Sequence, residues 1–525
     1  MHVSLKALAL AAGLGAGALM LSQPTLAETL VVAAERTPEG LDTDIRLPGT
    51  QEVIVQTYEG LLRYGRSKDA NGNEVLDTGK IEPHLAESWK VADDGKSVTF
   101  KLREGVKSPA GNELTSEDVV WGYKKAIAQK RTGAFLMNVA QVEDVVADSK
   151  YGVTYKLKGP NAFLLPILTS FVPGIYDSVE AKKHATAEDP WAAKHIQFNT
   201  LGFGAYTLQT LKPGEEAIYI ANPNYFLGKP HYDRIVYRAV PSVSNRALLL
   251  KSGQVHSAIN LGLQNIQQFA NDKNFTVLDR PRRGAASLAM NPKLPPFEDI
   301  RVRQAVGWSI DRESLNKSVF QGKGVVANTP VPPYIPGAAQ DLYPTPTRDI
   351  AKAKALLAEA GHADGIDVEL IYADTSGWEE AYAVQAAAQL KEANIRVKLA
   401  KLSPTDLRAR QAVSRRDIPF QIVEDGPFVM DALYTMSIIA KTNGSSNQSA
   451  YSDPALDEKI NQASMVMDDA KRLELTRAIQ KEWLDKMIWA HGVFRPLFKV
   501  VPKRVSGYLW HPDEHERWAD LKPAK

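Results

Sequence analysis

The sequence predicts an α/β protein, because segments with helical and strand periodicity alternate along its second half. Asp349 is an N-cap signal for a helix over residues 351–360, and Gly361 is a natural end for that helix. A strand, a helix and a second strand follow, over residues 367–373, 378–394 and 395–402. This β-α-β alternation implies a parallel sheet with helical crossovers.

Near the N-terminus, residues 28–34 form an almost continuous apolar run, as expected of a strand that is covered on both faces. A helix is expected to end over residues 55–62. Residues 98–103 alternate between apolar and polar, which predicts a strand with one wet face. Thr115 and Asp118 form a capping-box variant ahead of a helix over 119–126.

The middle and the end of the chain carry further elements. Strands alternate through residues 206–240, and Gly253 is a left-handed cap for the helix before it. A strand ends at Met290, and an amphipathic helix begins near Asp299. We also expect an apolar strand over 420–423 and one long helical stretch over 455–489.

The first 27 residues are typical of a secretory signal peptide. Lys6 supplies the positive charge, residues 5–21 are almost wholly apolar, and Gln23-Pro24 precedes a small residue at Ala27. The alternative is an uncleaved membrane anchor, but the apolar run is shorter than the roughly 20 residues of a spanning helix. Because the sequence contains no cysteine, no lipid can be attached through one. We therefore expect a soluble protein in a Gram-negative periplasm.

Composition excludes several classes of protein. The 63 basic residues nearly balance the 61 acidic ones, so no strong field would recruit nucleic acid. The lack of cysteine removes thiol nucleophiles, cysteine-based zinc sites and iron–sulfur clusters. With 525 residues, the chain is long enough for two to four domains by the prior of about 100–200 residues each.

Three separated blocks of sequence resemble the family 5 extracellular solute-binding proteins, the receptors of peptide-type ABC importers. The block from Met290 to Arg312 resembles the family pattern N…PPF-D-RVR-A…AIDR. Residues 81–126 carry the second block, which resembles P.LAESW…DG…F.LR.GV…G..T..DV. Residues 38–62 resemble P..LDP…YEGL, with Thr43 in place of the proline.

This resemblance implies a type II periplasmic-binding-protein fold with two lobes, a hinge and an appended α/β domain. Two strand crossings, near residues 285 and 495, would form the hinge, and the lobes would close over a ligand. The implied division is a signal peptide over 1–27, lobe I over 28–57, 195–285 and 496–525, an appended domain over 58–194, and lobe II over 286–495.

The resemblance also implies a receptor that captures a small peptide and delivers it to an inner-membrane ABC permease with its ATPases. We expect a monomer with no enzymatic activity, no cofactor and no metal. The alternatives in the same class are opine or sugar-conjugate ligands and nickel chelates. Rivals from other classes are an exported hydrolase and a periplasmic chaperone.

The strongest candidate site follows the strand over 420–423, because ligands bind at the carboxyl ends of strands in open α/β sheets. Family members often read W..DY.DP there, and an aspartate binds the ligand's ammonium group. Here that aspartate is replaced by Phe428, so a salt bridge from this position is not expected, and Glu424 or Asp425 would have to serve instead. The alternative is that both are exposed turn carboxylates. The candidate residues are Glu424, Asp425, Gly426, Phe428 and Asp431.

Two further sets of candidates follow other strands. Arg36, Thr37 and Pro38 come after the first strand, and Arg36 could bind a carboxylate or phosphate, or form a surface ion pair instead. Tyr372, Asp374 and Trp378 follow the strand over 367–373, where Trp378 would either stack on a ligand or pack in the core. Arg282-Arg283-Gly284 would be a solvated turn or an anion contact.

Residues 511–515 spell H-x-x-E-H, the pattern of inverted zinc peptidases. Because Pro512 lies inside the pattern, a regular helix with both histidines on one face is not expected. We interpret this segment as a polar tail, with a surface metal site as the alternative. The sequence has no G-x-S-x-G elbow and no Walker A loop.

Overall fold

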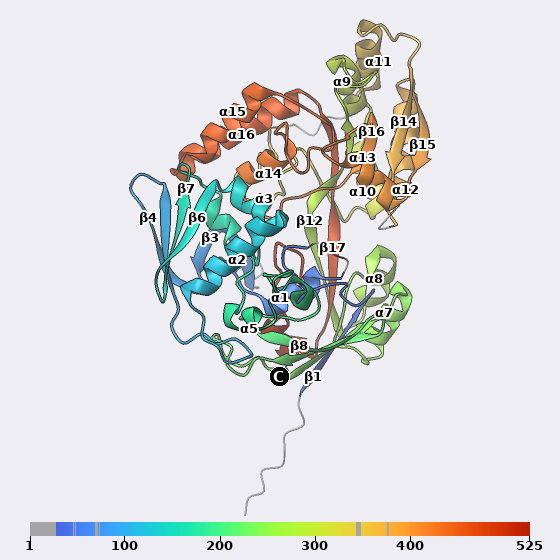
Figure 1. Ribbon diagram of the computed structural model, residues 1–525. Helices are drawn as coiled ribbons and strands as arrows, with labels where there is room; N and C mark the ends of the chain where they lie inside the picture. The colour runs from blue at the N-terminus through green and yellow to red at the C-terminus, as the bar shows by residue number, and fades with distance from the viewer. Residues whose placement is uncertain are drawn as a thin grey trace, which may run out of the picture.

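The computed structural model describes residues 28–45, 47, 49–68, 72, 74–342, 348–374 and 377–524. The predicted signal peptide lies outside these residues. The described part is mixed α/β, as predicted, with a five-stranded sheet in the lower half of Figure 1 and a six-stranded sheet in the upper half. In the six-stranded sheet, β12 (Phe275–Met290) and β17 (Trp489–Pro502) are long strands that run side by side between the two halves.

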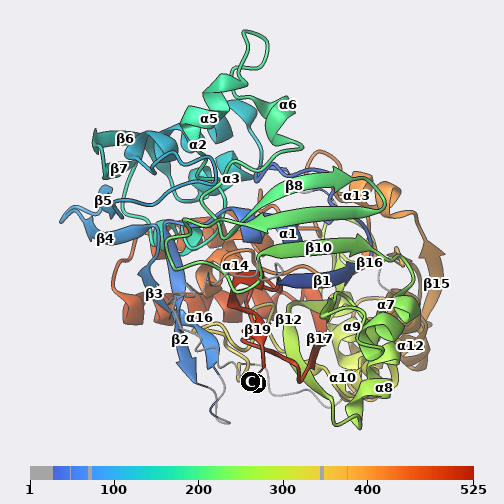
Figure 2. The ribbon, with the colours of Figure 1, turned by 90° about the horizontal axis from the view of Figure 1, so that it is seen from below.

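The five-stranded sheet begins with the first strand of the mature chain. Strand β1 pairs in parallel with β10 and β11, and β10, β9 and β8 follow in antiparallel order. Figure 2 shows β8, β10 and β1 side by side, with α7 and α8 near one end. The elements are β1 (Thr29–Ala34), α1 (Gln51–Thr57), β8 (Tyr206–Lys212), β9 (Glu216–Ala221), β10 (Arg234–Ala239), α7 (Val243–Lys251), β11 (Ser257–Ala258) and α8 (Gly262–Ala270).

The six-stranded sheet has the order β13-β17-β12-β16-β14-β15. Its predicted β-α-β unit is confirmed, since β14 and β15 pair in parallel on either side of α12 in sequence. Strand β16 is parallel to β14 but antiparallel to β12. The strands are β13 (Val325–Val326), β14 (Ile366–Tyr372), β15 (Ile395–Lys401) and β16 (Phe420–Val423), and the helices are α9 (Ile300–Ser309), α10 (Arg312–Phe320), α11 (Ile350–Glu359), α12 (Glu379–Glu392) and α13 (Pro404–Gln411).

The segment between α1 and β8 forms a separate antiparallel sheet of β4-β5-β7-β6 and a hairpin of β2 and β3. The predicted capping box is present, because both the Thr115 and the Asp118 side chains accept at the start of α2. The elements are β2 (Leu62–Lys68), β3 (Glu74–Pro83), β4 (Ala86–Val91), β5 (Ser97–Leu102), α2 (Ser116–Gln129), α3 (Thr132–Val139), β6 (Val142–Ser149), β7 (Gly152–Leu157), α4 (Leu164–Ile167), α5 (Ser178–Lys183) and α6 (Ala193–Ile196).

Two predicted helices differ from the structure. The helix expected to end at residue 62 ends at Thr57, because the chain leaves the helix before Gly60, where a Cβ would lie 2.8 Å from the carbonyl oxygens of Leu168 and Ser170. The long helical stretch over 455–489 is two helices, α15 (Pro454–Ser464) and α16 (Asp469–Asp485). The break has a local cause, since Asp468 caps the second helix by accepting from the Lys471 amide.

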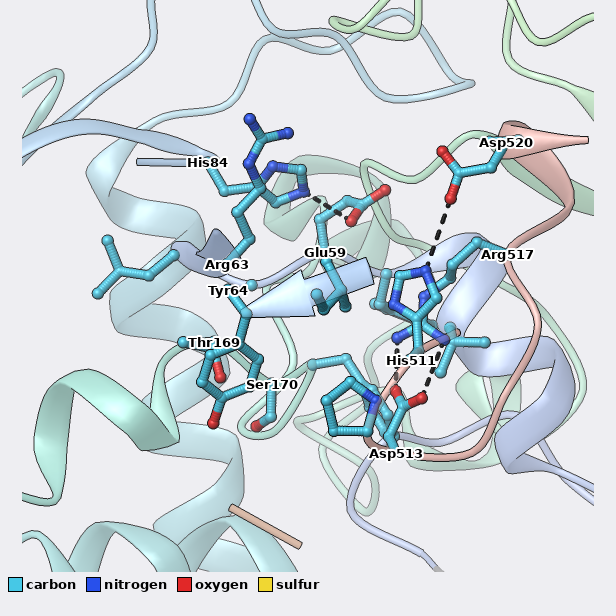
Figure 3. Close-up of a pocket in the computed structure, with 18 of the residues that line it drawn as sticks. Glu59, Arg63, Tyr64, His84, Thr169, Ser170, His511, Asp513, Arg517 and Asp520 are labelled. Carbon is cyan, nitrogen blue, oxygen red and sulfur yellow. Dashed lines mark hydrogen bonds and ion pairs between the residues drawn. The ribbon is translucent and has the colours of Figure 1, made fainter. Parts of the chain in front are cut away.

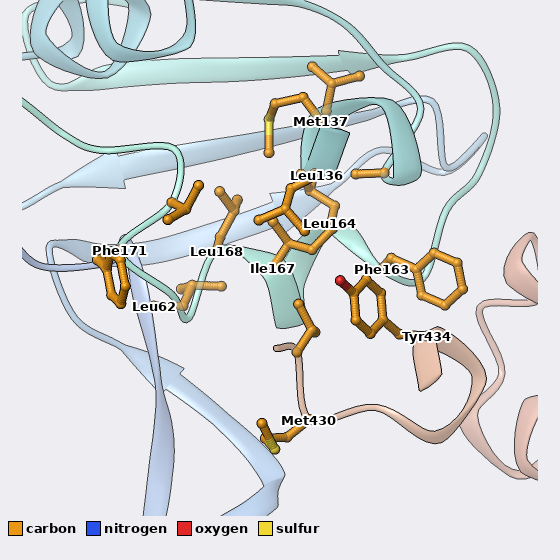
Figure 4. Close-up of a cluster of buried hydrophobic side chains, with 14 of the residues drawn as sticks. Leu62, Leu136, Met137, Phe163, Leu164, Ile167, Leu168, Phe171, Met430 and Tyr434 are labelled. Carbon is orange, nitrogen blue, oxygen red and sulfur yellow. The ribbon is translucent and has the colours of Figure 1, made fainter. Parts of the chain in front are cut away.

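The segment between α1 and β8 shares an apolar core with α14 (Ala432–Ile439), α15 and α16. Figure 4 shows Tyr434 beside Phe163, and Met430 below Ile167. The rings of Phe163 and Tyr434 meet edge to face with centroids 6.0 Å apart. The remaining short elements close the chain: β18 (Val505–Ser506), the 3₁₀ turn η1 (Trp518–Asp520) and β19 (Lys522–Pro523).

Candidate functional site

A central cavity of about 150 Å³ lies where α1, the β2–β3 hairpin, the end of β16 and the C-terminal tail meet (Figure 3). Its walls come from segments that are far apart in the sequence, and they carry both charged and aromatic side chains. The lining includes Glu59, Arg63, Tyr64, Arg66, His84, Phe171, Tyr225, Phe428, Met430, His511, Asp513, Arg517 and Asp520.

The carboxylates of the central cavity are held by cations and hydroxyl groups of the protein. Glu59 accepts a 2.7 Å hydrogen bond from the Tyr225 hydroxyl, and its other oxygen lies 2.9 Å from His84 Nε2. Asp513 forms a two-contact ion pair with Arg517, which Figure 3 shows as dashed lines. These pairings leave little free negative charge in the cavity, so it differs from a cation-binding site.

Asp520 adds a third charged pair on the same wall. Its Oδ1 accepts from Arg66 at 3.2 Å, and its Oδ2 lies 3.5 Å from His511 Nε2. Burial would raise the pKa of Asp520, but His511 and Arg66 more than offset it, so the pKa is lowered. For Asp513 the opposing burial is also outweighed, by Arg517 and His515, and its pKa is lowered. Both carboxylates are therefore charged at neutral pH.

The C-terminal tail reaches this cavity because a buried glutamine of α1 holds it. The Gln56 side chain donates to the Glu516 carbonyl oxygen at 2.6 Å and accepts from the Trp518 amide at 2.9 Å. Trp518 is buried against the five-stranded sheet. Residues 511–513 thus form a fixed part of the wall of the central cavity. No group of three or more metal-binding side chains occurs among the described residues.

A second cavity of about 160 Å³, here called the bulge cavity, lies at an irregularity in β12. The pairing of β12 with β17 shifts register between Pro281 and Ala285. Sequence analysis favoured a solvated turn at this point, whereas the chain stays in the strand and bulges. The lining residues are Arg282, Arg283, Gly284, Glu424, Asp425, Gly426, Phe428 and Glu514. Phe428 also lines the central cavity, so the two cavities share this residue.

Two glycines allow the bulge of β12 and the loop after β16 to touch backbone to backbone. A Cβ on Gly426 would lie 2.1 Å from the Arg283 carbonyl oxygen, which is closer than atoms can approach. A Cβ on Gly284 would lie 3.0 Å from the Asp425 carbonyl group. This contact fixes the backbones of Arg283 and Asp425 beside each other in the cavity wall.

The predicted residues after β16 all lie in this region, but with different partners. Glu424 is half-buried and forms a bidentate pair with Arg495 at 2.7 and 2.6 Å. Asp425 accepts from the Gly426 amide at 2.8 Å and from Gln448 at 3.4 Å. The Phe428 ring packs edge to face on Phe171. Asp431 caps α14 by accepting from the Tyr434 amide at 2.8 Å.

The residues predicted after β14 approach the site through Arg495. The Arg495 guanidinium lies over the Trp378 ring, 4.7 Å from its centroid, while pairing with Glu424. Trp378 and Tyr372 are buried in the apolar core of the six-stranded sheet. Asp374 pairs with Lys401 at 3.3 Å. The Trp378 ring therefore packs against the arginine of the Glu424–Arg495 pair.

The residues predicted after β1 lie apart from both cavities as the described residues define them. The Arg36 side chain is 47% exposed and pairs with Glu35 and Glu39 of its own loop. Thr37 is buried and its hydroxyl accepts from the Gly214 amide at 2.9 Å. Pro38 is buried. Their contribution to ligand binding stays a prediction.

Sequence reasoning missed most of the polar cavity wall. Glu514 receives both Arg282, at 2.7 Å, and the Arg283 amide, at 2.9 Å, although more than 230 residues separate them. Arg495 and Arg517 carry no local sequence signal. The one available signal is the density of charged residues in the C-terminal tail, which the sequence analysis interprets as a polar tail.

Comparison with known proteins defines the class first: the fold is that of bacterial solute-binding proteins. The protein DppA of Helicobacter pylori, solved with the peptide STSA, superposes with a TM-score of 0.78 at 21% identity, covering 95% of this chain and 98% of that one. MoaA from A. tumefaciens R10, solved with mannopinic acid, gives a TM-score of 0.76 at 23% identity, covering 95% of this chain and all of that one.

The family follows from the sequence itself. The profile described as "Bacterial extracellular solute-binding proteins, family 5 Middle" matches residues 80–447, and the chain belongs to that family. A probable di/tripeptide-binding protein 5 of Pseudomonas aeruginosa is 27% identical over 94% of this chain and 95% of its own length. The predicted resemblance and fold are thereby confirmed, and the chain is a solute-binding receptor. Within the described residues, no helix is long and apolar enough to cross a membrane.

Proposed function

We propose that this receptor acts in the periplasm and captures a small peptide or peptide-like solute at the junction of the central and bulge cavities. The observation that carries the proposal is that these two cavities meet at Phe428 and are walled by three distant parts of the chain. Binding sites for small solutes are concave and combine apolar walls with a few placed polar groups.

The charges of the cavities bear on which solute binds. A peptide's ammonium group needs a carboxylate, because an unpaired buried charge costs several kcal/mol. Glu424 is already neutralised by Arg495, and Phe428 offers an aromatic face instead of a charge. We assign an ammonium group to Asp425, because it lines the bulge cavity and its backbone is held against Gly284. An opine-like conjugate, which presents hydroxyl and carboxyl groups, is the second candidate, and the uncharged Phe428 favours it.

We further propose that capture proceeds by closure of two lobes about β12 and β17. Lobe I would comprise residues 28–57, 195–285 and 496–525, the appended domain 58–194, and lobe II 286–495. The bulge at Pro281–Ala285 interrupts the pairing of the two strands near the proposed boundary. Ligand contacts from both lobes would stabilise the closed state by the difference in affinity between open and closed forms.

The partner that follows from this role is an ABC permease of the inner membrane with its ATPases. We propose that the receptor works as a monomer without enzymatic activity. Nickel chelates stay a further ligand class for this family, and their binding would depend on the chelator's own carboxylates. The balanced charge of the chain, 63 basic against 61 acidic residues, supports a small-molecule ligand over nucleic acid.

A thermal-shift screen tests the proposal. The mature protein is unfolded and refolded to remove carried-over solute, then heated with di- to pentapeptides, opine and sugar conjugates, and nickel chelates. A ligand at a hundredfold excess over its Kd stabilises the folded state by about 2.7 kcal/mol. We expect a clear shift with free peptides or with conjugates. If the protein cleaves the peptides and a chelator abolishes this cleavage, the protein is a metal-dependent hydrolase and the receptor proposal is wrong.

A further inference from the structure

The bulge cavity contains an arginine, Arg283, whose charge helps Arg282 to lower the pKa of Glu514 against the effect of burial, but whose guanidinium group donates no hydrogen bond within the described ranges. Arg282 is paired with Glu514 at 2.7 Å, and Arg495 is paired with Glu424. Arg283 lies between these pairs in the same wall, and its side chain forms no ion pair or hydrogen bond within the described ranges, although its backbone amide donates to Glu514.

A guanidinium group carries five donors in a fixed plane, and no nitrogen of the Arg283 side chain is among the fully buried unpaired polar atoms of the described residues, so these donors are open to the cavity. The nearby carboxylates are already engaged: both Glu514 oxygens accept, from Arg282 and from the Arg283 amide. Arg283 is half-buried, so water does not screen it as fully as it screens a surface arginine. The positive charge is therefore available to a group that enters the cavity.

The backbone under Arg283 is fixed on both sides. Glu514 holds its amide, and the loop at Gly426 touches its carbonyl oxygen. Because this backbone is already fixed, ligand binding has to order only the Arg283 side chain and not the loop that carries it. Asp425 lies on the neighbouring backbone in the same cavity, so positive and negative groups flank the space.

We propose that Arg283 binds a carboxylate of the captured solute. The planar fork of arginine matches a carboxylate bidentately. The charges around the cavity sum to zero once Arg495 is included, with three arginines against Glu424, Asp425 and Glu514. A singly charged carboxylate is therefore better tolerated than a doubly charged phosphate. This assignment rests on the proposed function, and it applies equally to a peptide's C-terminus and to an opine's carboxyl group.

The test compares Arg283→Gln with the wild-type protein on matched ligands. Each solute that binds in the screen is also prepared as its carboxamide, and calorimetry gives Kd for both forms. We expect the wild-type protein to prefer the acid at least tenfold. Arg283→Gln should bind the acid 10- to 100-fold more weakly and no longer discriminate acid from amide. Arg283→Lys, which keeps the charge but not the fork, should recover part of the loss.

Arg238→Gln is the matched control, because Arg238 is exposed on β10 and its loss changes the net charge equally. It should leave both Kd values unchanged. Equal affinity of Arg283→Gln and the wild type for the acid would overturn the role of Arg283 while leaving the receptor intact. If the wild type binds no peptide, opine or chelate, the proposed ligand classes fail together with this inference. Thermal unfolding of Arg283→Gln without ligand checks that the variant is folded.

Discussion

Two clusters of charged side chains join distant parts of this chain, and they differ in whether space remains beside them. In the first, the Lys125 ammonium group donates to both Asp42 oxygens, at 2.7 and 2.9 Å, and to Asp44 at 3.2 Å. The three side chains are at most 1% exposed. In the second, the bulge cavity, similar pairs surround an open volume of about 160 Å³.

The two clusters differ in what their charged groups can do: those of the first hold segments of the chain together, and those of the second also line a space open to a ligand. The Lys125 cluster links the loop after β1 to α2, and Gln129 and the Tyr176 hydroxyl complete its contacts. Burial raises the pKa of Asp44 even though Lys125 opposes this, and Asp42 raises it further. A ligand cannot enter such a cluster. In the bulge cavity Arg283 lines a space that a solute can fill, which is the basis of the binding role proposed for its charge.

The largest expected effect is on folding stability, from Lys125→Met. Removing one partner of a buried ion pair leaves uncompensated charge and typically costs about 3–5 kcal/mol. Here Asp42 and Asp44 would remain together without a cation. Urea unfolding measures the loss, and Lys124→Met is the control, since Lys124 is the exposed neighbour on α2. A loss below 1 kcal/mol would mean that the cluster does not hold these segments together.

Stability should also depend on pH through His491, which is buried in β17. Burial lowers its pKa from 6.5 to about 3, with Arg312 adding to the effect. Its pKa is lower in the folded than in the unfolded state, so the unfolded chain binds a proton that the folded chain does not. The stabilisation is complete above pH 6.5 and is lost as pH falls towards 3.

The free energy of unfolding of the wild-type protein should fall with pH through this one proton, by about 1.4 kcal/mol per pH unit between pH 6 and 4. We expect His491→Leu to remove this contribution to the slope. Denaturant unfolding at several pH values gives the two slopes. Parallel slopes for His491→Leu and the wild type would show that His491 titrates normally in the folded protein.

Gly426→Ala breaks the bulge cavity without changing a charge. The new methyl group would meet the Arg283 carbonyl oxygen at 2.1 Å, so the two backbones must separate. Overpacking of this kind costs about 1–3 kcal/mol. Affinity should fall as well, because Arg283 and Asp425 move apart. Gly159→Ala is the control, since its methyl group would find no atom closer than 3.9 Å. An unchanged Kd would separate the cavity from ligand binding.

Elements with local signals were predictable from the sequence. The capping box of α2 and the Asp349 cap of α11 each depend on residues that are close together in the sequence, and both caps are present. The break between α15 and α16 also had a local signal in Asp468, which sequence analysis overlooked. The helix expected to end over residues 55–62 ends at Thr57, because Gly60 packs against the backbone of residues 168–170. That contact depends on tertiary structure.

The candidate site was only partly predictable for the same reason. The loop after β16 was located by its place at a strand end, and Glu424, Asp425, Gly426 and Phe428 do line the bulge cavity. The other wall comes from Glu514 and from the bulge in β12, which are joined across more than 230 residues. No spacing rule connects such positions. The pairing of Glu424 with Arg495 likewise spans 71 residues.

The smallest expected effect is that of Arg36→Ala, which sharpens the contrast with Arg283. Both arginines follow or interrupt a strand, and both were candidates for binding an anion. Arg36 is 47% exposed and has two carboxylate partners in its own loop, and exposed pairs contribute about 0–1 kcal/mol. We therefore expect Arg36→Ala to change stability by less than 1 kcal/mol and Kd by less than twofold. If it instead weakens binding as much as Arg283→Gln, the ligand reaches the end of β1, and closure must bring that loop over the cavity and break its pairs with Glu35 and Glu39.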